Sequence, residues 1–124
     1  MDLKEKWKQK KINIINAERA RKMTQSYLNN IRDADINTFF KLFDIWVSNS
    51  CNDGDFSFNT NIDDKFQIFD NEVANIIKCK LKEKGYTIKY RTETIEYKDE
   101  IITSYTGFTV SWDKSNDDKE VISL

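Results

Sequence analysis

Small and apolar side chains recur at steps of three and four residues along the first quarter of the chain. The stripe consists of Ile14, Ala17, Ala20, Thr24, Leu28 and Ile31. Because no glycine or proline interrupts residues 3–31, this spacing predicts one long amphipathic helix, whose apolar face Leu3 and Trp7 continue. The small side chains would let another backbone approach this helix closely.

A second helix is expected to begin at Asp33 or Asp35, since either carboxylate can accept hydrogen bonds from the free amides of a helix start. Two apolar faces follow: Ile36, Phe39, Phe40, Phe43 and Val47 mark the first, and Leu42, Ile45 and Trp46 mark the second. A helix this apolar must be covered on more than one side, either by its own sheet and the first helix or by a second subunit.

A short strand and a third helix are predicted next. Phe56 and Phe58 alternate with polar neighbours after an Asp-Gly turn, which is typical of a strand. The stretch 62–69 fits neither a helix nor a strand clearly. From Asp70 the spacing of Val73, Ile76, Ile77 and Leu81 predicts a helix that four lysines and Gly85 bring to an end.

Two long strands complete the pattern, roughly 86–97 and 101–112, joined by a three-residue loop. In that register Tyr86 faces Trp112, Ile88 faces Val110 and Tyr90 faces Phe108, all on one face. Farther out the apolar residues change sides, so that Ile95, Tyr97, Ile101 and Tyr105 leave the core face. A bulge near residues 91–94 would undo this switch.

These elements together predict an α+β protein. The expected order is α-α-β-α-β-β, with a small antiparallel sheet covered by helices on one face. Residues 1–112 are expected to form a single domain with a long N-terminal helix, and residues 113–124 an acidic, flexible tail.

Composition restricts the function classes. The chain is 39% hydrophobic and 33% charged with no proline, and it has neither a secretion signal nor an apolar run that could span a membrane, which predicts a soluble cytoplasmic protein. The net charge of -1 argues against a nucleic-acid coat protein. This average conceals an asymmetry, because residues 1–32 carry nine basic and three acidic residues, whereas residues 33–124 carry eleven and eighteen.

Catalytic and metal chemistry is poorly supported. The chain has no histidine, three glycines and two cysteines 28 residues apart, Cys51 and Cys79. These numbers exclude a histidine-based triad and a glycine-rich phosphate loop, and they disfavour a zinc site. We therefore expect no enzymatic activity, no metal and no cofactor, and we expect both cysteines to be free, buried thiols.

Binding residues are better supplied. Flat rings, hydroxyls and cations that could hold a nucleotide crowd the hairpin and the first helix, and the candidates are Arg19, Lys22, Tyr90, Arg91, Thr92, Tyr97 and Tyr105. Tyrosine and threonine are also good strand formers, so packing on a half-buried ribbon is the favoured interpretation of the hairpin residues. The candidates for a subunit interface are Leu3, Trp7, Ala17, Ala20, Trp46, Ile95 and Ile101.

Three segments carry a resemblance: AERARKMT in the first helix, EVANIIKCKLKEKGYTI in the third, and GFTVSW in the last strand. Their order resembles that in small accessory proteins encoded by bacteriophages and prophages of AT-rich bacteria. The resemblance implies a viral accessory gene, and it supplies no catalytic residue.

The resulting expectation is a non-enzymatic, homo-oligomeric phage protein that counters host defence by sequestering a host component, such as a nucleotide immune signal. Two alternatives stay open: a direct inhibitor of a host defence protein such as a nuclease, and a virion or scaffold component. A membrane or nucleic-acid partner is not expected, and the location is expected to be the host cytoplasm.

Overall fold

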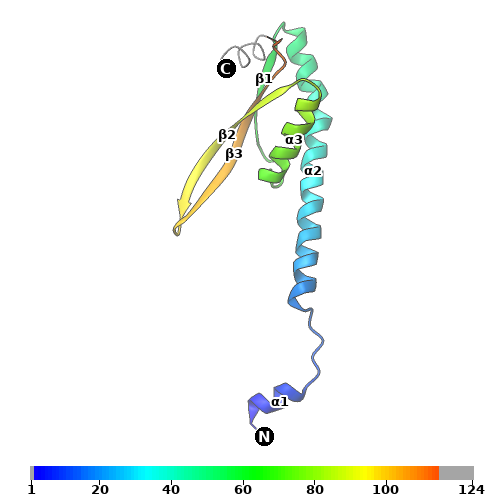
Figure 1. The fold of residues 1–124 in the computed structure, drawn as a ribbon, viewed down its shortest axis with the longest axis vertical. Helices are drawn as coiled ribbons and strands as arrows, with labels where there is room; N and C mark the ends of the chain where they lie inside the picture. The colour runs from blue at the N-terminus through cyan, green and yellow to red at the C-terminus, as the bar shows by residue number, and fades with distance from the viewer. Residues whose placement is uncertain (1, 115–124) are drawn as a thin grey trace.

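The α+β class and the element order are confirmed by a computed structural model, which describes residues 2–114 (Figure 1). The elements are α1 Leu3–Gln9, α2 Ala17–Asn52, β1 Ser57–Asn61, α3 Asn71–Glu83, β2 Thr87–Tyr97 and β3 Glu100–Ser111. Nearly all of the expected tail, residues 115–124, lies outside the described part of the chain.

The boundary between the first two helices was predicted wrongly. Helix α1 ends at Gln9, and α2 then runs unbroken from Ala17 through the expected start at Asp33 or Asp35. The Asn16 side chain begins α2 by accepting a hydrogen bond from the Arg19 amide at 2.9 Å. The residues 10–16 before it include three isoleucines and two asparagines, which are weaker helix formers than the lysines, alanines and leucines around them.

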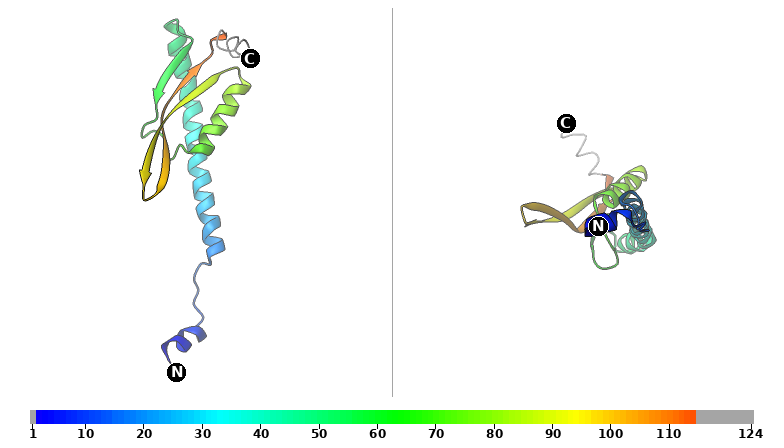
Figure 2. Two further views of the ribbon diagram at one scale, coloured as in Figure 1. Left: turned by 60° about the vertical axis from the view of Figure 1, so that its left-hand side comes forward. Right: turned by 90° about the horizontal axis from the view of Figure 1, so that it is seen from below.

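Helix α2 is much longer than the body that it supports. The sheet and α3 pack beside its C-terminal half, while its N-terminal half projects away and leads to α1 (Figures 1 and 2). Every side chain from residue 2 to residue 27 is exposed. We call residues 2–31 the N-terminal arm; its α2 portion alone extends about 20 Å at 1.5 Å per residue.

The sheet is antiparallel in the order β1-β3-β2, so β3 is the central strand. Its inner face packs on α2 and α3. The sheet and α3 together cover part of the apolar surface of α2 from within one chain, whereas Ile45 stays 55% exposed. The buried core consists of Phe39, Phe43, Phe58, Phe66, Phe69, Val73, Ala74, Ile77, Leu81, Ile88, Phe108 and Val110. Phe56, predicted to belong to the same strand as Phe58, lies before β1 and is exposed.

The hairpin follows the predicted register only near the core. Ile88 pairs with Val110 and Tyr90 with Phe108, as expected, but the register shifts by one between Arg91 and Thr92. The connecting turn consists of two residues, Lys98 and Asp99, both with positive φ as a type I′ turn requires. The expected three-residue loop was therefore wrong.

The bulge returns the outer residues of β3 to the faces expected of a core strand, but it does not do so for the outer residues of β2. Beyond it Ile95 pairs with Ile102 and Tyr97 with Glu100, not with the partners that the three-residue loop implied. Because the extra residue lies on β3, Tyr105 returns to the core side of the ribbon, whereas Ile95 remains on the opposite face.

The ambiguous stretch 62–69 is a loop without helix or strand, and Asp35 anchors it. The buried Asp35 carboxylate, 1% exposed, accepts hydrogen bonds from the backbone amides of Gln67, Ile68 and Phe69 at 2.7–2.8 Å. Phe69 has a φ of 31°, a left-handed conformation that is costly for a bulky residue, while its ring is buried in the core. The carboxylate expected to start a helix thus holds a distant loop instead.

Helix α3 matches its prediction closely. Asp70 caps it by accepting from the Val73 amide at 3.1 Å, and Gly85 follows its end with a φ of 88°. Arg32 of α2 donates to the same Asp70 carboxylate at 2.8 Å, and this hydrogen bond raises the pKa of the Arg32 guanidinium. The start of α3 is thereby fixed against α2.

Candidate functional site

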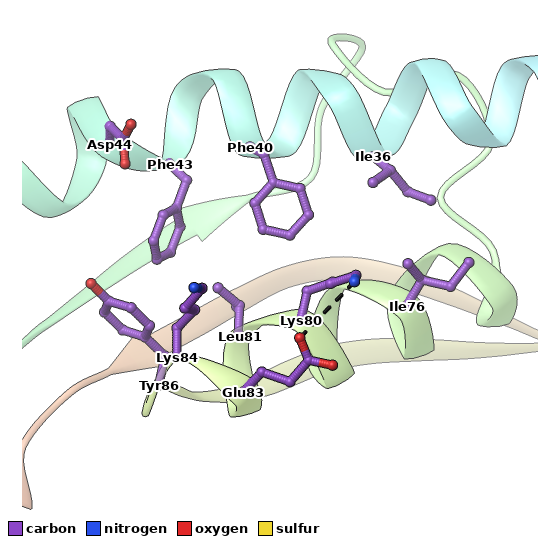
Figure 3. A pocket seen from close by; sticks show the side chains of 10 residues that line it. All are labelled: Ile36, Phe40, Phe43, Asp44, Ile76, Lys80, Leu81, Glu83, Lys84 and Tyr86. Carbon is purple, nitrogen blue, oxygen red and sulfur yellow. Dashed lines mark ion pairs between the residues drawn. The ribbon is translucent and has the colours of Figure 1, made fainter.

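A groove between α2 and α3 hollows the surface of the body, with a volume of about 840 Å³. Its lining, which we call the α2–α3 groove, consists of Ile36, Phe40, Phe43, Asp44, Ile76, Lys80, Leu81, Glu83, Lys84 and Tyr86. Figure 3 shows Phe40 and Phe43 directed from α2 toward α3, above Leu81 and Tyr86. The floor of the groove is therefore apolar and aromatic.

The residues of the floor differ in how far the core covers them. Phe43 and Leu81 are buried, whereas Phe40 and Tyr86 are only partly covered and Ile76 is 37% exposed. The Phe43 and Tyr86 rings meet edge to face with centroids 5.0 Å apart. The groove thus exposes the outer surface of the core instead of being a gap in it.

The charged side chains of the rim balance one another. Asp44 stands on the α2 side, and Lys80, Glu83 and Lys84 stand on the α3 side (Figure 3). Lys80 pairs with Glu83 at 4.0 Å, and both side chains are more than half exposed. Two carboxylates and two ammonium groups give the rim no net charge.

The two tyrosines predicted to hold a ligand lie together on the core side of the sheet. The Tyr90 and Tyr105 ring centroids are 5.2 Å apart, and each ring also contacts Phe69. Tyr90 donates its hydroxyl hydrogen to the Ala74 carbonyl at 2.9 Å, and Tyr105 donates to the Asn71 side chain. Both hydroxyls therefore bind α3, and burial raises the pKa of Tyr90.

Arg91 lies on the other face of the sheet and crosses the central strand. Its guanidinium donates to Asn59, Asn61 and the Thr60 carbonyl of β1, and to Thr109 of β3, at 3.0–3.3 Å. It passes over Gly107, where an added Cβ would lie 2.7 Å from Arg91 Cζ. The guanidinium group predicted to bind a phosphate instead links the two edge strands, β1 and β2, to the central strand β3.

The remaining ligand candidates lie elsewhere. Arg19 and Lys22 lie on the exposed arm, beside a shallow hollow that Tyr27 also lines. Thr92 is exposed on the core side of the hairpin just past the bulge, and Tyr97 is exposed at the hairpin end on the opposite face. One copy of the chain therefore does not bring the seven predicted residues into a single site.

The predicted interface residues separate into two groups. Trp46 packs on its own core, with ring centroids 5.7 Å from those of Phe39, Phe58 and Phe108. The others are exposed: Leu3, Trp7, Ala17, Ala20, Ile95 and Ile101. One tryptophan of the predicted interface is thus satisfied within the chain.

The cysteines are free, as predicted, but both are exposed, so the expectation that they are buried was wrong. Each lies on an outward-facing side of its helix, because the core contacts of α2 and α3 come from other positions on the helical wheel. Among residues 2–114 no group of histidine, cysteine, aspartate and glutamate side chains is arranged to hold a metal ion.

Sequence reasoning missed the α2–α3 groove. Phe40 and Ile76 were each assigned to the apolar face of a helix, and the separation of those helices does not follow from either pattern. The available signal was the apolar character of α2 over most of its circumference, which indicates more apolar surface than its neighbours can cover.

Compared with known protein families, with curated proteins and with solved structures, the chain matches none of them. Within residues 2–114, no helix combines the length and the apolar character that crossing a membrane requires.

Proposed function

We propose that this protein is a non-enzymatic binding protein that sequesters a partner protein by seating an amphipathic helix of that partner in the α2–α3 groove. The observation that supports this function best is the groove's combination of an apolar floor with a rim of zero net charge. Grooves of this kind bind the apolar face of a helix, while the rim charges pair with its polar flanks.

The dimensions fit such an occupant. From Ile36 to Asp44 the groove follows nine residues of α2, whose ends lie about 12 Å apart along the helix axis, slightly more than two turns. A partner helix of that length presents two or three apolar side chains on one face, at spacings of three and four residues. Phe40 lies at the middle of the α2 side of the groove, so we expect it to contact the central apolar side chain of the partner helix.

A nucleotide fits the same surface less well. Its phosphates would meet Asp44 and Glu83 as well as the two lysines, and like charges at a binding surface oppose association. Tyr90, Tyr105 and Arg91, which could have recognised a nucleotide, already donate to groups of their own chain. These observations favour the protein-inhibitor alternative over a nucleotide sponge.

The test compares native protein with Phe40→Asp in tagged form, each expressed in the cells that naturally make the protein. We expect a partner recovered near one-to-one with native protein and at least tenfold less with Phe40→Asp. Lys41→Asp, on the exposed side of the same helical turn, is the matched control and should retain the partner. Circular dichroism verifies that all three proteins are folded.

Two results would contradict the proposal. The first is an unchanged set of bound proteins with Phe40→Asp. The second is a nucleotide, released by heating and detected by mass spectrometry, in place of a stoichiometric protein partner. A phage origin, a role against host defence, a cytoplasmic location and the virion-component alternative all stay predictions, which expression timing and particle composition would test.

A further inference from the structure

The N-terminal arm carries exposed apolar side chains and a net positive charge. Leu3 is 71% exposed, Trp7 is 51% exposed, and Ile12, Ile14 and Ile15 follow in the segment between α1 and α2. Residues 2–31 include eight basic and three acidic residues, giving a formal charge of +5. An apolar surface of this size, bordered by lysines, is typical of a protein-interaction surface.

In α1 the two kinds of side chain are ordered. Leu3 and Trp7 are four residues apart and therefore lie on one helical face, with lysines at positions 4, 6 and 8 beside them. Lys10 places its ammonium group 4.7 Å from the centroid of the Trp7 ring. The helix thus offers an apolar pair within a cationic border.

The far half of the hairpin has the opposite charge. On the face away from α2 and α3, Ile95 and Ile102 form a cross-strand pair beside Tyr97, and all three are 45–59% exposed. Glu93 borders this apolar patch on one side and Glu100 on the other. Residues 92–106 include four acidic residues and one lysine, a formal charge of -3.

We propose that the N-terminal arm of one copy docks on the hairpin of a second copy, forming a two-fold symmetric dimer. Leu3 and Trp7 of one chain pack on the Ile95, Ile102 and Tyr97 patch of the other. The lysines of α1 then face the glutamates that border the patch. Apolar contact supplies the affinity, and the opposite charges select the orientation.

A second copy suits the hairpin better than the chain's own arm. The arm and the hairpin project from the same end of the body, and the arm continues away from the hairpin to place α1 at the far end of the molecule (Figures 1 and 2). When two copies are turned antiparallel, each arm runs back along the other copy toward its hairpin. Two-fold symmetry then buries the same pair of surfaces twice.

Three-residue charge reversals test the docking. The arm variant combines Lys4→Glu, Lys6→Glu and Lys8→Glu. The hairpin variant combines Glu93→Lys and Glu100→Lys, which border the patch, with Glu96→Lys on the opposite face of the ribbon. The first changes the arm from +5 to -1 and the second changes the hairpin from -3 to +3, so each variant brings like charges together. The control reverses Lys78, Lys82 and Lys114, which lie outside both surfaces.

Sedimentation equilibrium measures the mass of each sample. We expect native protein and the control at twice the chain mass of 14.7 kDa, and each reversal variant shifted at least tenfold toward monomer. A one-to-one mixture of the two variants should recover the dimer, because the reversed arm of one then faces the reversed hairpin of the other. An arm folded onto its own hairpin cannot produce that recovery.

Three outcomes would overturn the docking. Native protein that stays monomeric at 100 times the concentration used for folding studies excludes it, and so does a dimer that neither variant weakens. Failure of the mixture to associate, with both variants folded by circular dichroism, also excludes it. The dimer is independent of the α2–α3 groove, since Phe40→Asp should leave the mass unchanged.

Discussion

Asp35→Asn is expected to be one of the most destabilising single-atom changes available in this chain. The carboxylate is buried and accepts from three backbone amides, one through Oδ1 and two through Oδ2. Asparagine keeps the shape but places an NH2 group where one of the oxygens was. At least one backbone N–H then faces another donor in place of its acceptor.

The magnitude follows from the three hydrogen bonds. Bonds to a charged group contribute about 1.5–3 kcal/mol each and bonds between neutral groups about 1 kcal/mol, so loss of the charge weakens all three. Each bond loses at least about 0.5 kcal/mol, and an unsatisfied donor adds a penalty of at least about 1 kcal/mol, so the total loss is at least about 2.5 kcal/mol. Small domains have about 5–15 kcal/mol of unfolding free energy, so much of it would disappear.

Urea unfolding followed by circular dichroism measures the loss, with Asp33→Asn as the matched control on the exposed side of the same helix. Hydrogen exchange should show faster exchange at Gln67, Ile68 and Phe69 in Asp35→Asn, because these amides lose their acceptor. A loss below 1 kcal/mol with these amides still protected would refute the assignment of Asp35 as the anchor of the loop.

Two further predictions concern the sheet. Gly107→Ala should destabilise the protein by about 1–3 kcal/mol, because the new Cβ would lie 2.7 Å from Arg91 Cζ and 2.9 Å from the Thr60 carbonyl oxygen. The loss of unfolding free energy caused by Gly107→Ala should be smaller when Arg91 is already alanine. Equal losses in this double-mutant cycle would be inconsistent with an Arg91 side chain that crosses over Gly107. Burial, aided by the neighbouring Tyr105, raises the pKa of Tyr90 above its ordinary value near 10. Above that pH the phenol ionises in the unfolded chain but keeps its proton in the folded one, so the unfolded state binds fewer protons and stability falls as pH rises. The urea midpoint should therefore decrease more between pH 8 and pH 11 for native protein than for Tyr90→Phe. Equal decreases in the two proteins would argue against burial of Tyr90 as the cause.

Local patterns predicted the elements whose ends carry their own signals. Asp70 and Gly85 mark both ends of α3, and alternation near the core correctly paired Ile88 with Val110. Such features depend on residues close together in the chain, or on one turn between two strands. At Asp35 and Arg91, by contrast, the prediction failed because the deciding contact came from far away.

Asp35 is the clearest case of such a distant contact. Its sequence context fits a helix start, yet its carboxylate accepts hydrogen bonds from amides 32–34 residues later in the chain. Asp35 therefore does not cap a new helix, and α2 continues through it. Arg91 is a second case, because its guanidinium group, which suits a phosphate, instead donates to β1 across the central strand. Each of these side chains could serve several partners, and only the folded arrangement selects one.

The amino-acid sequence by itself determined the α+β class, the order of the elements and the separation of a basic N-terminal part from an acidic remainder. It could do so because helix and strand periods, caps and charge are local properties of the chain. Tertiary structure alone decided that Asp35 holds a distant loop within an unbroken α2, how the bulge turns Tyr105 inward, and which apolar side chains stay uncovered in the groove, the arm and the hairpin. Those outcomes depend on how elements distant in the chain pack, because a side chain's exposure is set by what the rest of the fold brings against it.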